Sequence, residues 1–198
     1  MIRVGTSGWS YPSWRGGFYP EGMKPTDFLG FYAERFDTVE LNSTGYRLPS
    51  EDQFRRWAAA VPDGFRFAVK LPLTRLDRVT PFLERVLALG DRLGPVRVVV
   101  EAARDDGLMS FVEGSVPPGV ELAWDLRHES WAGAEGTMVR VGDRKAEPFR
   151  YLRLREPPYS DEQLAAAAAG IRDPAYVFLR HEDEPTAPVY AQKLRAGL

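Results

Sequence analysis

The sequence predicts an α/β fold of the TIM type, in which a single domain over residues 1–198 forms a parallel (β/α) barrel of seven or eight strands. Short apolar or alternating runs, typical of strands, take turns along the chain with segments of helical periodicity. The connections are short, which favours parallel strands joined by right-handed crossovers. Because no glycine-rich phosphate loop follows the first run, an open nucleotide-binding sheet has less support than a closed barrel.

Four strands and three helices are expected in the first half of the chain. The strands span residues 2–7, 38–42, 65–70 and 96–100, and the helices begin near Pro25, Ser50 and Pro81. Ser50 and Gln53 have the spacing of a capping box. Gly94-Pro95 is expected to end the third helix at about residue 93. The apolar run that follows is typical of a strand covered on both faces.

The second half is predicted to be less regular. A short helix over 108–113 precedes a strand over 120–127, and further strands are expected at 137–141, 149–154 and 176–179. An alanine-rich helix is expected at 161–169 and a closing helix at 185–194. No linker or change of composition divides the chain, so we expect one hydrophobic core.

The composition limits the classes of function. Hydrophobic residues make up 44% and charged residues 27%, and the net charge is −2. No basic block provides the footprint on which duplex-binding proteins rely, so nucleic-acid binding is disfavoured. The absence of cysteine excludes disulfides and thiolate chemistry. Two histidines are too few for a His-rich zinc site, and no metal ligand is assigned, although a carboxylate-dominated magnesium or manganese site stays open.

The N-terminus suggests no targeting segment. Residues 1–5 begin a strand-like run rather than the charged and then apolar pattern of a signal peptide. No apolar stretch approaches the roughly 20 residues that span a bilayer. We therefore expect a cytoplasmic protein that does not bind membranes. The sequence identifies no cofactor and leaves the oligomeric state open.

Polar side chains gather where the predicted strands end, and in a closed barrel these ends converge on the face that carries active sites. The catalytic candidates are Glu40, Lys70, Asp125 and His128, and the substrate-binding candidates are Ser7, Trp9, Tyr11, Asn42, Arg127, Trp131 and Arg153. We expect one concave pocket, lined by Ser7, Trp9, Glu40, Asn42, Lys70, Asp125, Arg127 and His128.

Each candidate has a role that its chemistry suggests. Lys70, Arg127 and Arg153 are expected to hold an anion, because arginine forks match carboxylate and phosphate groups. Glu40 and Asp125 are the acid–base candidates, and His128 is a proton shuttle near neutral pH.

Structural roles stay open for the same residues. The aromatic side chains of residues 9–18 form either a hydrophobic plug or a platform for substrate. Glu40 paired with Lys70 or Arg127 would be a structural ion pair, because buried charges are rarely unpaired. Asp125 would then hold an arginine, with His128 as a local cap. Ser7 is not expected to be a nucleophile, because no histidine is predicted beside it.

Four ordered motifs connect this chain to a known family. They are Gly5-Thr6-Ser7-Gly8-Trp9-Ser10-Tyr11, Glu40-Leu41-Asn42-Ser43-Thr44, the run 65–70, and Asp125-Leu126-Arg127-His128-Glu129-Ser130-Trp131. In this order they resemble the YecE-like family, the domain of unknown function 72. The resemblance runs with gaps from Arg3 to about Leu194. It implies a TIM-barrel fold and no established reaction.

The chain also departs from the family pattern. The family's Glu in the last of the four motifs is Asp125 here, and its Arg-x-His-Gly motif on the seventh strand is replaced by Arg153-Leu154-Arg155-Glu156. Between Trp131 and Phe149 the chain is too short for the family's usual helix and strand. We therefore expect the barrel to be irregular or shortened there.

Three functions compete on this basis. The first is an enzyme that acts on a small anionic or sugar-like metabolite, since two carboxylates among aromatic rings also suit sugar chemistry. The alternative is a non-catalytic binding module that kept its pocket while the second half diverged. Nucleic-acid processing is the least favoured, because barrel nucleases use more metal-binding histidines than this chain has.

Overall fold

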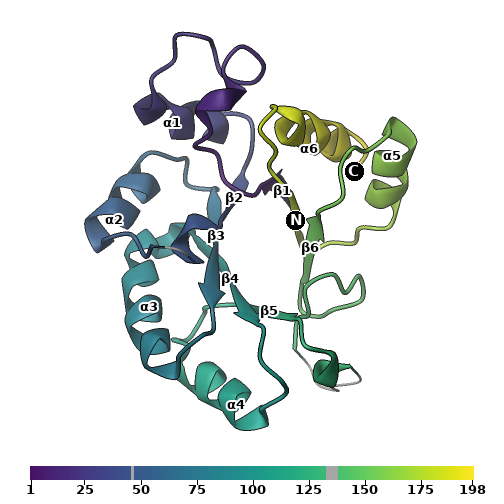
Figure 1. The fold of residues 1–198 in the computed structure, drawn as a ribbon. Coiled ribbons are helices and arrows are strands. Elements are labelled where there is room, and N and C mark those ends of the chain that lie inside the picture. Colours follow the sequence, from purple (N-terminus) through teal and green to yellow (C-terminus); the bar gives the residue numbers. More distant parts are fainter. Residues whose placement is uncertain (46, 133–137) are drawn as a thin grey trace.

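The protein, described here by a computed structural model of residues 1–45, 47–132 and 138–198, has seven parallel strands in two sheets (Figure 1). The four-stranded sheet has the order β2 (Thr38–Leu41), β3 (Arg66–Pro72), β4 (Leu93–Val100) and β5 (Leu122–Leu126). The three-stranded sheet has the order β1 (Ile2–Thr6), β7 (Ala175–Leu179) and β6 (Arg150–Leu154). All strand pairs are parallel, which confirms the predicted α/β class.

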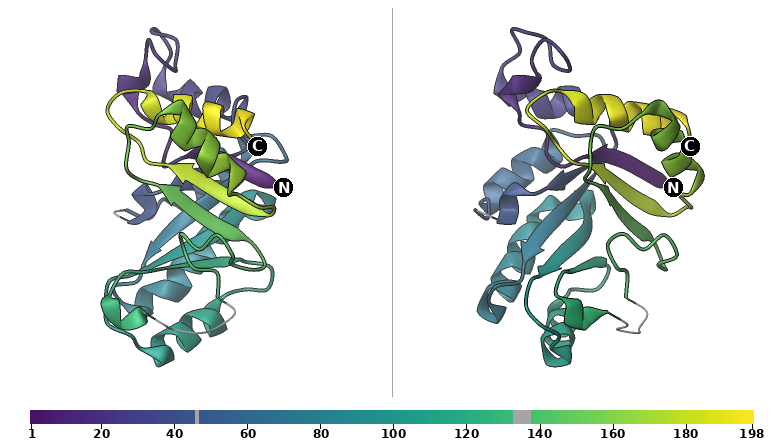
Figure 2. Two further views of the ribbon diagram at one scale, coloured as in Figure 1. Left: turned by 90° about the vertical axis from the view of Figure 1, so that its right-hand side faces the viewer. Right: turned by 45° about the vertical axis from the view of Figure 1, so that its right-hand side comes forward.

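Six α-helices in the described residues lie outside the two sheets (Figures 1 and 2). They are α1 (Phe28–Ala33), α2 (Glu51–Ala59), α3 (Val79–Val86), α4 (Asp106–Ser115), α5 (Asp161–Ala169) and α6 (Thr186–Ala196). The expected cap of α2 forms, because the Ser50 hydroxyl accepts a hydrogen bond from the Gln53 amide at 3.2 Å. Within the described segments, no helix combines the length and the apolar character that crossing a bilayer would demand.

The predicted closed barrel does not form among the described residues. Between the described residues of the two sheets, the backbones pair through isolated parallel bridges, Ser7↔Glu40 on one side and Trp124↔Arg140 with Val141↔Tyr151 on the other. The expected strand over 137–141 is thus reduced to single bridges at its last two residues, and its first residue lies outside the described residues. The chain between β5 and β6 is too short to supply a full strand with continuous ladders on both sides.

The prediction was also wrong about residues 87–95. The helix expected to reach residue 93 ends at Val86, and a 3-10 helix (Leu87–Arg92) follows it. Strand β4 then begins before Gly94-Pro95 instead of after it. Proline has no amide hydrogen to give to a ladder. The β3–β4 pairing accommodates it with a shift of register between Phe67 and Val69.

The core has two layers, one on each side of the strands. Alternate residues of β4, such as Val96, Val98 and Val100, pack outward against the helices. On the inner side, Ala68, Ala123, Tyr151 and Phe178 come from both sheets and form one cluster. Because the pairings within the sheets and the bridges between them are all parallel, the C-terminal ends of the strands lie on the same side of the molecule. That side carries the candidate site.

We predict that Gly5→Ala destabilises the fold. A β-carbon at position 5 would collide with the backbone carbonyl of Thr38, where β1 approaches β2. Backbone atoms cannot swing aside, so a loss of about 1–3 kcal/mol in the free energy of unfolding is expected in urea denaturation. Gly114→Ala in α4 is the control, because no atom lies within 4 Å of its new β-carbon. Equal stability of the two variants would contradict this close approach.

Candidate functional site

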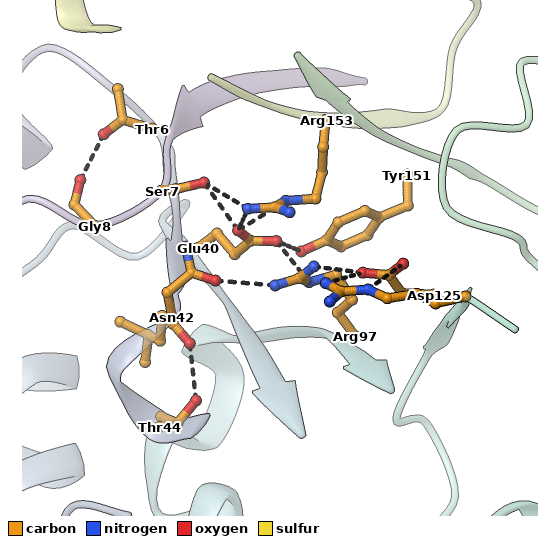
Figure 3. A network of polar contacts seen from close by, with 12 residues as sticks. Thr6, Ser7, Gly8, Glu40, Asn42, Thr44, Arg97, Asp125, Tyr151 and Arg153 are labelled. Carbon is orange, nitrogen blue, oxygen red and sulfur yellow. Dashed lines mark hydrogen bonds and ion pairs between the residues drawn. The ribbon is translucent and has the colours of Figure 1, made fainter. Parts of the chain in front are cut away.

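A fully buried carboxylate lies where the two sheets meet (Figure 3). Glu40 Oε2 accepts a hydrogen bond from the Ser7 hydroxyl at 2.9 Å, and Oε1 accepts one from the Tyr151 hydroxyl at 2.7 Å. Arg153 donates from Nε to Oε2 at 3.1 Å. Arg97 Nε lies 2.9 Å from Oε1 as an ion pair, but its N–H makes no hydrogen bond. We call Ser7, Glu40, Arg97, Tyr151 and Arg153 the buried cluster.

Strand geometry explains how these residues come together. Ser7 directly follows β1, and its bridge to Glu40 aligns the end of β1 with β2. Tyr151 and Arg153 are two residues apart on β6, so both face inward from the opposite sheet. Arg97 faces inward from β4, where the flanking valines face outward. Four strands therefore contribute to the buried cluster.

The electrostatics of the buried cluster keep Glu40 ionised. Burial pushes the pKa of the Glu40 carboxyl upward, but the guanidinium groups of Arg97 and Arg153 and the two hydroxyl hydrogen bonds outweigh it. The net pKa lies below the usual value, since opposite charges and donors favour the carboxylate form. Glu40 thus has no proton to donate near neutral pH.

A second carboxylate, Asp125, connects the buried Arg97 to the more exposed Arg127. Its Oδ2 accepts from Arg97 Nη1 at 2.7 Å and from Arg127 Nη2 at 3.2 Å. Burial raises the pKa of Asp125, but the contacts with Arg127 and Arg97 lower this pKa by more than burial raises it, so its net shift is downward. Arg127 also pairs with Glu101. Arg97 Nη2 donates to the Asn42 side-chain oxygen at 2.9 Å.

Lys70 stands beside these groups on β3. It is in register with Arg97 on β4, and Ala68, two residues earlier, faces the inner cluster. The Thr44 hydroxyl donates to the Lys70 carbonyl at 2.7 Å and fixes the backbone there. The Lys70 side chain is half-buried. Burial lowers the pKa of its ammonium group, and the nearby Arg97 and Arg127 lower it further.

Among the described residues, the side chains expected to line one pocket lie in two different environments. Ser7 and Glu40 are buried inside the cluster, whereas Trp9, Tyr11 and Asn42 line a separate groove of about 620 Å³. The groove lies between the start of α1 and α2, and Trp57 of α2 meets Trp9 edge-on with ring centroids 5.1 Å apart. Asn42 connects the groove to the buried cluster, because it lines the groove and its side-chain oxygen accepts a hydrogen bond from Arg97.

Two predicted site residues have local structural contacts instead. His128 is exposed, and its Nδ1 accepts from the Ser130 amide at 3.2 Å, which caps the short turn Glu129–Trp131. This is the cap that was the alternative prediction for His128. Trp131 is buried and donates from its ring nitrogen to the Ala102 carbonyl at 3.0 Å. Trp131 thus contacts the loop after β4, whereas His128 bonds within its own turn.

Sequence reasoning missed two members of the buried cluster, Arg97 and Tyr151. Arg97 interrupts an otherwise apolar strand, and that single charge was the available signal. The signal for Tyr151 was weaker: it lies two residues before Arg153 on the same strand, so both side chains face the same side of the sheet. The expected partners of Glu40 were Lys70 and Arg127, but its ion pairs are with Arg97 and Arg153. In the described part of the chain, no group of three or more potential metal ligands occurs.

Comparisons with known proteins agree with the resemblance found in the sequence. The family model described as "Protein of unknown function DUF72" matches residues 3–141. The UPF0759 protein YecE of Escherichia coli K12 is 36% identical over 206 residues, which cover 96% of this chain and 70% of that protein.

Solved structures support the same fold. The crystal structure of a DUF72 family protein from Thermotoga maritima MSB8 matches with a TM-score of 0.74 at 24% identity, covering 99% of this chain and 98% of that one. One from Enterococcus faecalis V583 matches with a TM-score of 0.75 at 16% identity, covering 100% and 95%. Identities this low carry the fold and no reaction.

We predict that Glu40→Gln strongly destabilises the protein. The substitution keeps the shape of the side chain but leaves the buried guanidinium groups of Arg97 and Arg153 without their counter-charge. Breaking a buried ion pair on one side costs about 3–5 kcal/mol, which urea denaturation measures. Glu51→Gln, which removes an exposed ion pair with Arg55, is expected to cost less than about 0.5 kcal/mol. Similar losses in both variants would contradict a structural role for the cluster.

The effect of Glu40→Gln is also expected to depend on pH. The pKa of Glu40 in the folded protein lies below its usual value of 4.5. The carboxylate therefore stabilises the folded state above that pH, and this contribution is lost as the pH falls through the folded pKa. The difference in stability between the wild type and Glu40→Gln should be full near neutral pH and shrink in acid below 4.5. Urea denaturation over a pH series measures it, and a difference that widened in acid would contradict the prediction.

Proposed function

We propose that this chain, which belongs to the DUF72 family of proteins of unknown function, binds a small anionic metabolite at the C-terminal ends of its strands. The observation that carries the proposal is a gathering of cationic side chains at the strand ends. Among the described residues, the side chains of Arg97, Arg127 and Arg153 lie near enough to Lys70 to affect its charge, and neither Lys70 nor Arg127 is fully buried. Cationic side chains gathered in one place attract anions.

Exposure decides which of these cations would meet the metabolite. The side chains of Arg97 and Arg153 are only 1% and 9% exposed and already contact Glu40. Arg127 is 32% exposed, and its hydrogen bonds to Asp125 and Glu101 use three of the five N–H donors that a guanidinium has. Lys70 is half-buried beside it. We assign anion binding to Lys70 and Arg127 and a structural role to the other two.

The same contacts argue against the acid–base roles first considered for the carboxylates. Glu40 and Asp125 both have a lowered pKa and are held by arginines. A general acid or base that works at neutral pH needs a pKa near that pH. His128, the candidate proton shuttle, bonds within its own turn. We therefore treat Glu40 and Asp125 as positioning residues.

The adjoining groove gives room for the rest of the metabolite. Asn42 lines the groove and bonds Arg97, so it joins the groove to the charged network. The groove's volume, about 620 Å³, is in the range of small-molecule sites. Trp9 and Trp57 offer apolar surface beside the polar edge of Asn42. An anionic metabolite with a sugar-like or other compact body would fit this combination.

We predict that Arg127→Ala weakens the binding of inorganic phosphate. Losing a hydrogen bond to a charged group costs about 1.5–3 kcal/mol, which is roughly tenfold or more in Kd. Calorimetric titration at low ionic strength measures the change, because salt screens exposed charges. Lys193→Ala is the control, since it removes the same charge from an exposed residue that pairs with Asp161 on α5.

Thermal melts distinguish binding from a purely structural role. If Arg127 serves binding, phosphate raises the Tm of the wild type and of Lys193→Ala but raises that of Arg127→Ala much less. If Arg127 is structural only, Arg127→Ala melts lower and phosphate shifts all three proteins equally. That second result, or no binding of phosphate or of sugar phosphates by the wild type, would remove the support for an anion site.

A further inference from the structure

The groove beside the buried cluster contains two tryptophan rings that meet at a right angle. Trp9 lies in the loop after β1, Trp57 lies on α2, and their ring planes are 88° apart. Both line the groove, and Trp57 is only half-buried, so part of its surface is left for a ligand. A flat ring in this corner stacks on the face of one indole and meets the other edge-on, the two arrangements that aromatic rings prefer. The corner therefore favours a planar body over the puckered ring of a sugar.

The two side-chain amides of the groove have their oxygens occupied by arginines. Asn42 Oδ1 accepts from Arg97 Nη2 at 2.9 Å (Figure 3), and Gln53 Oε1 accepts from Arg56 Nη2 at 2.8 Å. A guanidinium only donates, so it orients each amide with the oxygen toward the arginine and the NH2 group away from it. Asn42 and Gln53 both line the groove. What they offer to a ligand there is N–H donors.

The charge of the groove favours the same kind of ligand. Among the described residues that line it, Arg56 is the only charged side chain, and no aspartate or glutamate occurs. The indole nitrogens of the groove also only donate, and the remaining polar side chains are hydroxyls, which donate as well as accept. A sugar needs acceptors for its many hydroxyl protons, and carboxylates are the strong acceptors among side chains. The groove therefore suits a ligand that itself supplies acceptors and negative charge.

We propose, on the basis of the anion-binding function above, that the metabolite is an aromatic acid whose ring carries a further hydrogen-bond acceptor, such as a carbonyl or a second carboxylate. The ring lies in the corner between Trp9 and Trp57, and the acceptor on the ring receives a hydrogen bond from the Gln53 amide. Asn42, which Arg97 orients, donates to the same molecule on the side of the buried cluster. Gln53 thus determines specificity, because its amide selects acceptors over donors on the ring.

Two ring acids of similar shape test this assignment. In para-nitrobenzoate the group opposite the carboxylate has acceptor oxygens, whereas in para-aminobenzoate it has N–H donors. In calorimetric titrations at neutral pH and low ionic strength, para-nitrobenzoate should bind roughly tenfold more tightly, a ratio that corresponds to about 1.4 kcal/mol. Glucuronate, a sugar acid, should bind more weakly than para-nitrobenzoate. Equal affinities for the two benzoates, or tighter binding of glucuronate, would overturn the proposal.

A substitution at Gln53 reverses the polarity of that position while nearly keeping its shape. In Gln53→Glu, Arg56 still has an oxygen to bond, and the second oxygen accepts where the amide donated. The preference should therefore invert, with para-aminobenzoate binding more tightly than para-nitrobenzoate. Gln192→Glu, the same change at an exposed position of α6, should keep the preference of the wild type. Impaired folding cannot produce an inverted preference, and an unchanged preference in Gln53→Glu would contradict the role of Gln53.

The outcomes also distinguish this proposal from the function on which it rests. If phosphate binds through Arg127 while the two benzoates bind equally, the aromatic acid is ruled out and the anion site stands. If neither phosphate nor either benzoate binds, both proposals fail. If para-nitrobenzoate binds with the expected dependence on Gln53 but phosphate does not bind and Arg127→Ala has no effect, the groove binds the aromatic acid and the anion site at Arg127 is wrong.

Discussion

A carboxylate that is taken out of water is stable in its charged form only if opposite charges and hydrogen-bond donors replace the lost hydration. Glu40 satisfies this condition with side chains that come from far apart in the chain: Ser7 follows β1, Arg97 lies on β4, and Tyr151 and Arg153 lie on β6. Because these strands belong to two different sheets, one ion cluster fixes how the sheets meet. In the part of the chain that the structure describes, the backbones of the two sheets are joined by isolated bridges, one of them between Ser7 and Glu40, so side-chain contacts carry much of the connection.

The buried cluster adjoins the apolar inner cluster, and Tyr151 belongs to both. Below Glu40, the small side chains Ala68 and Ala123 share the interior with the larger rings of Tyr151 and Phe178. Small and large residues from opposite sheets pack together in this layer. Tyr151 belongs to both layers, since its ring packs in the apolar cluster and its hydroxyl donates to Glu40. A phenylalanine at this position would fill the lower layer but leave one carboxylate oxygen without its donor.

The sequence was sufficient to predict the α/β class and the parallel strands. It also singled out Glu40 and Asp125, which follow from polar residues placed toward the ends of parallel strands. Arg97 could not be assigned in the same way. A run of valines indicates a strand covered on both faces, and only the tertiary structure shows that one inward position faces a carboxylate from β2. The irregular stretch between β5 and β6 was predicted, because the chain between Trp131 and Phe149 is too short for a further helix and strand. Only the strand expected over 137–141 was wrong in detail, since its described residues pair through single bridges at Arg140 and Val141.

Arg97 explains why binding is expected at the rim rather than inside the cluster. Its guanidinium contacts Glu40, Asp125 and Asn42 at once, so it cannot turn toward a bound anion without leaving one of them unpaired. The cost of an unpaired buried charge keeps Arg97 in place, and an arriving anion meets Arg127 and Lys70 instead. Arg97 thus serves to hold the strands together, whereas Arg127 and Lys70 would determine which ligand binds. Asp125 holds both Arg97 and Arg127 through one carboxylate oxygen, so it links the buried residues to the rim.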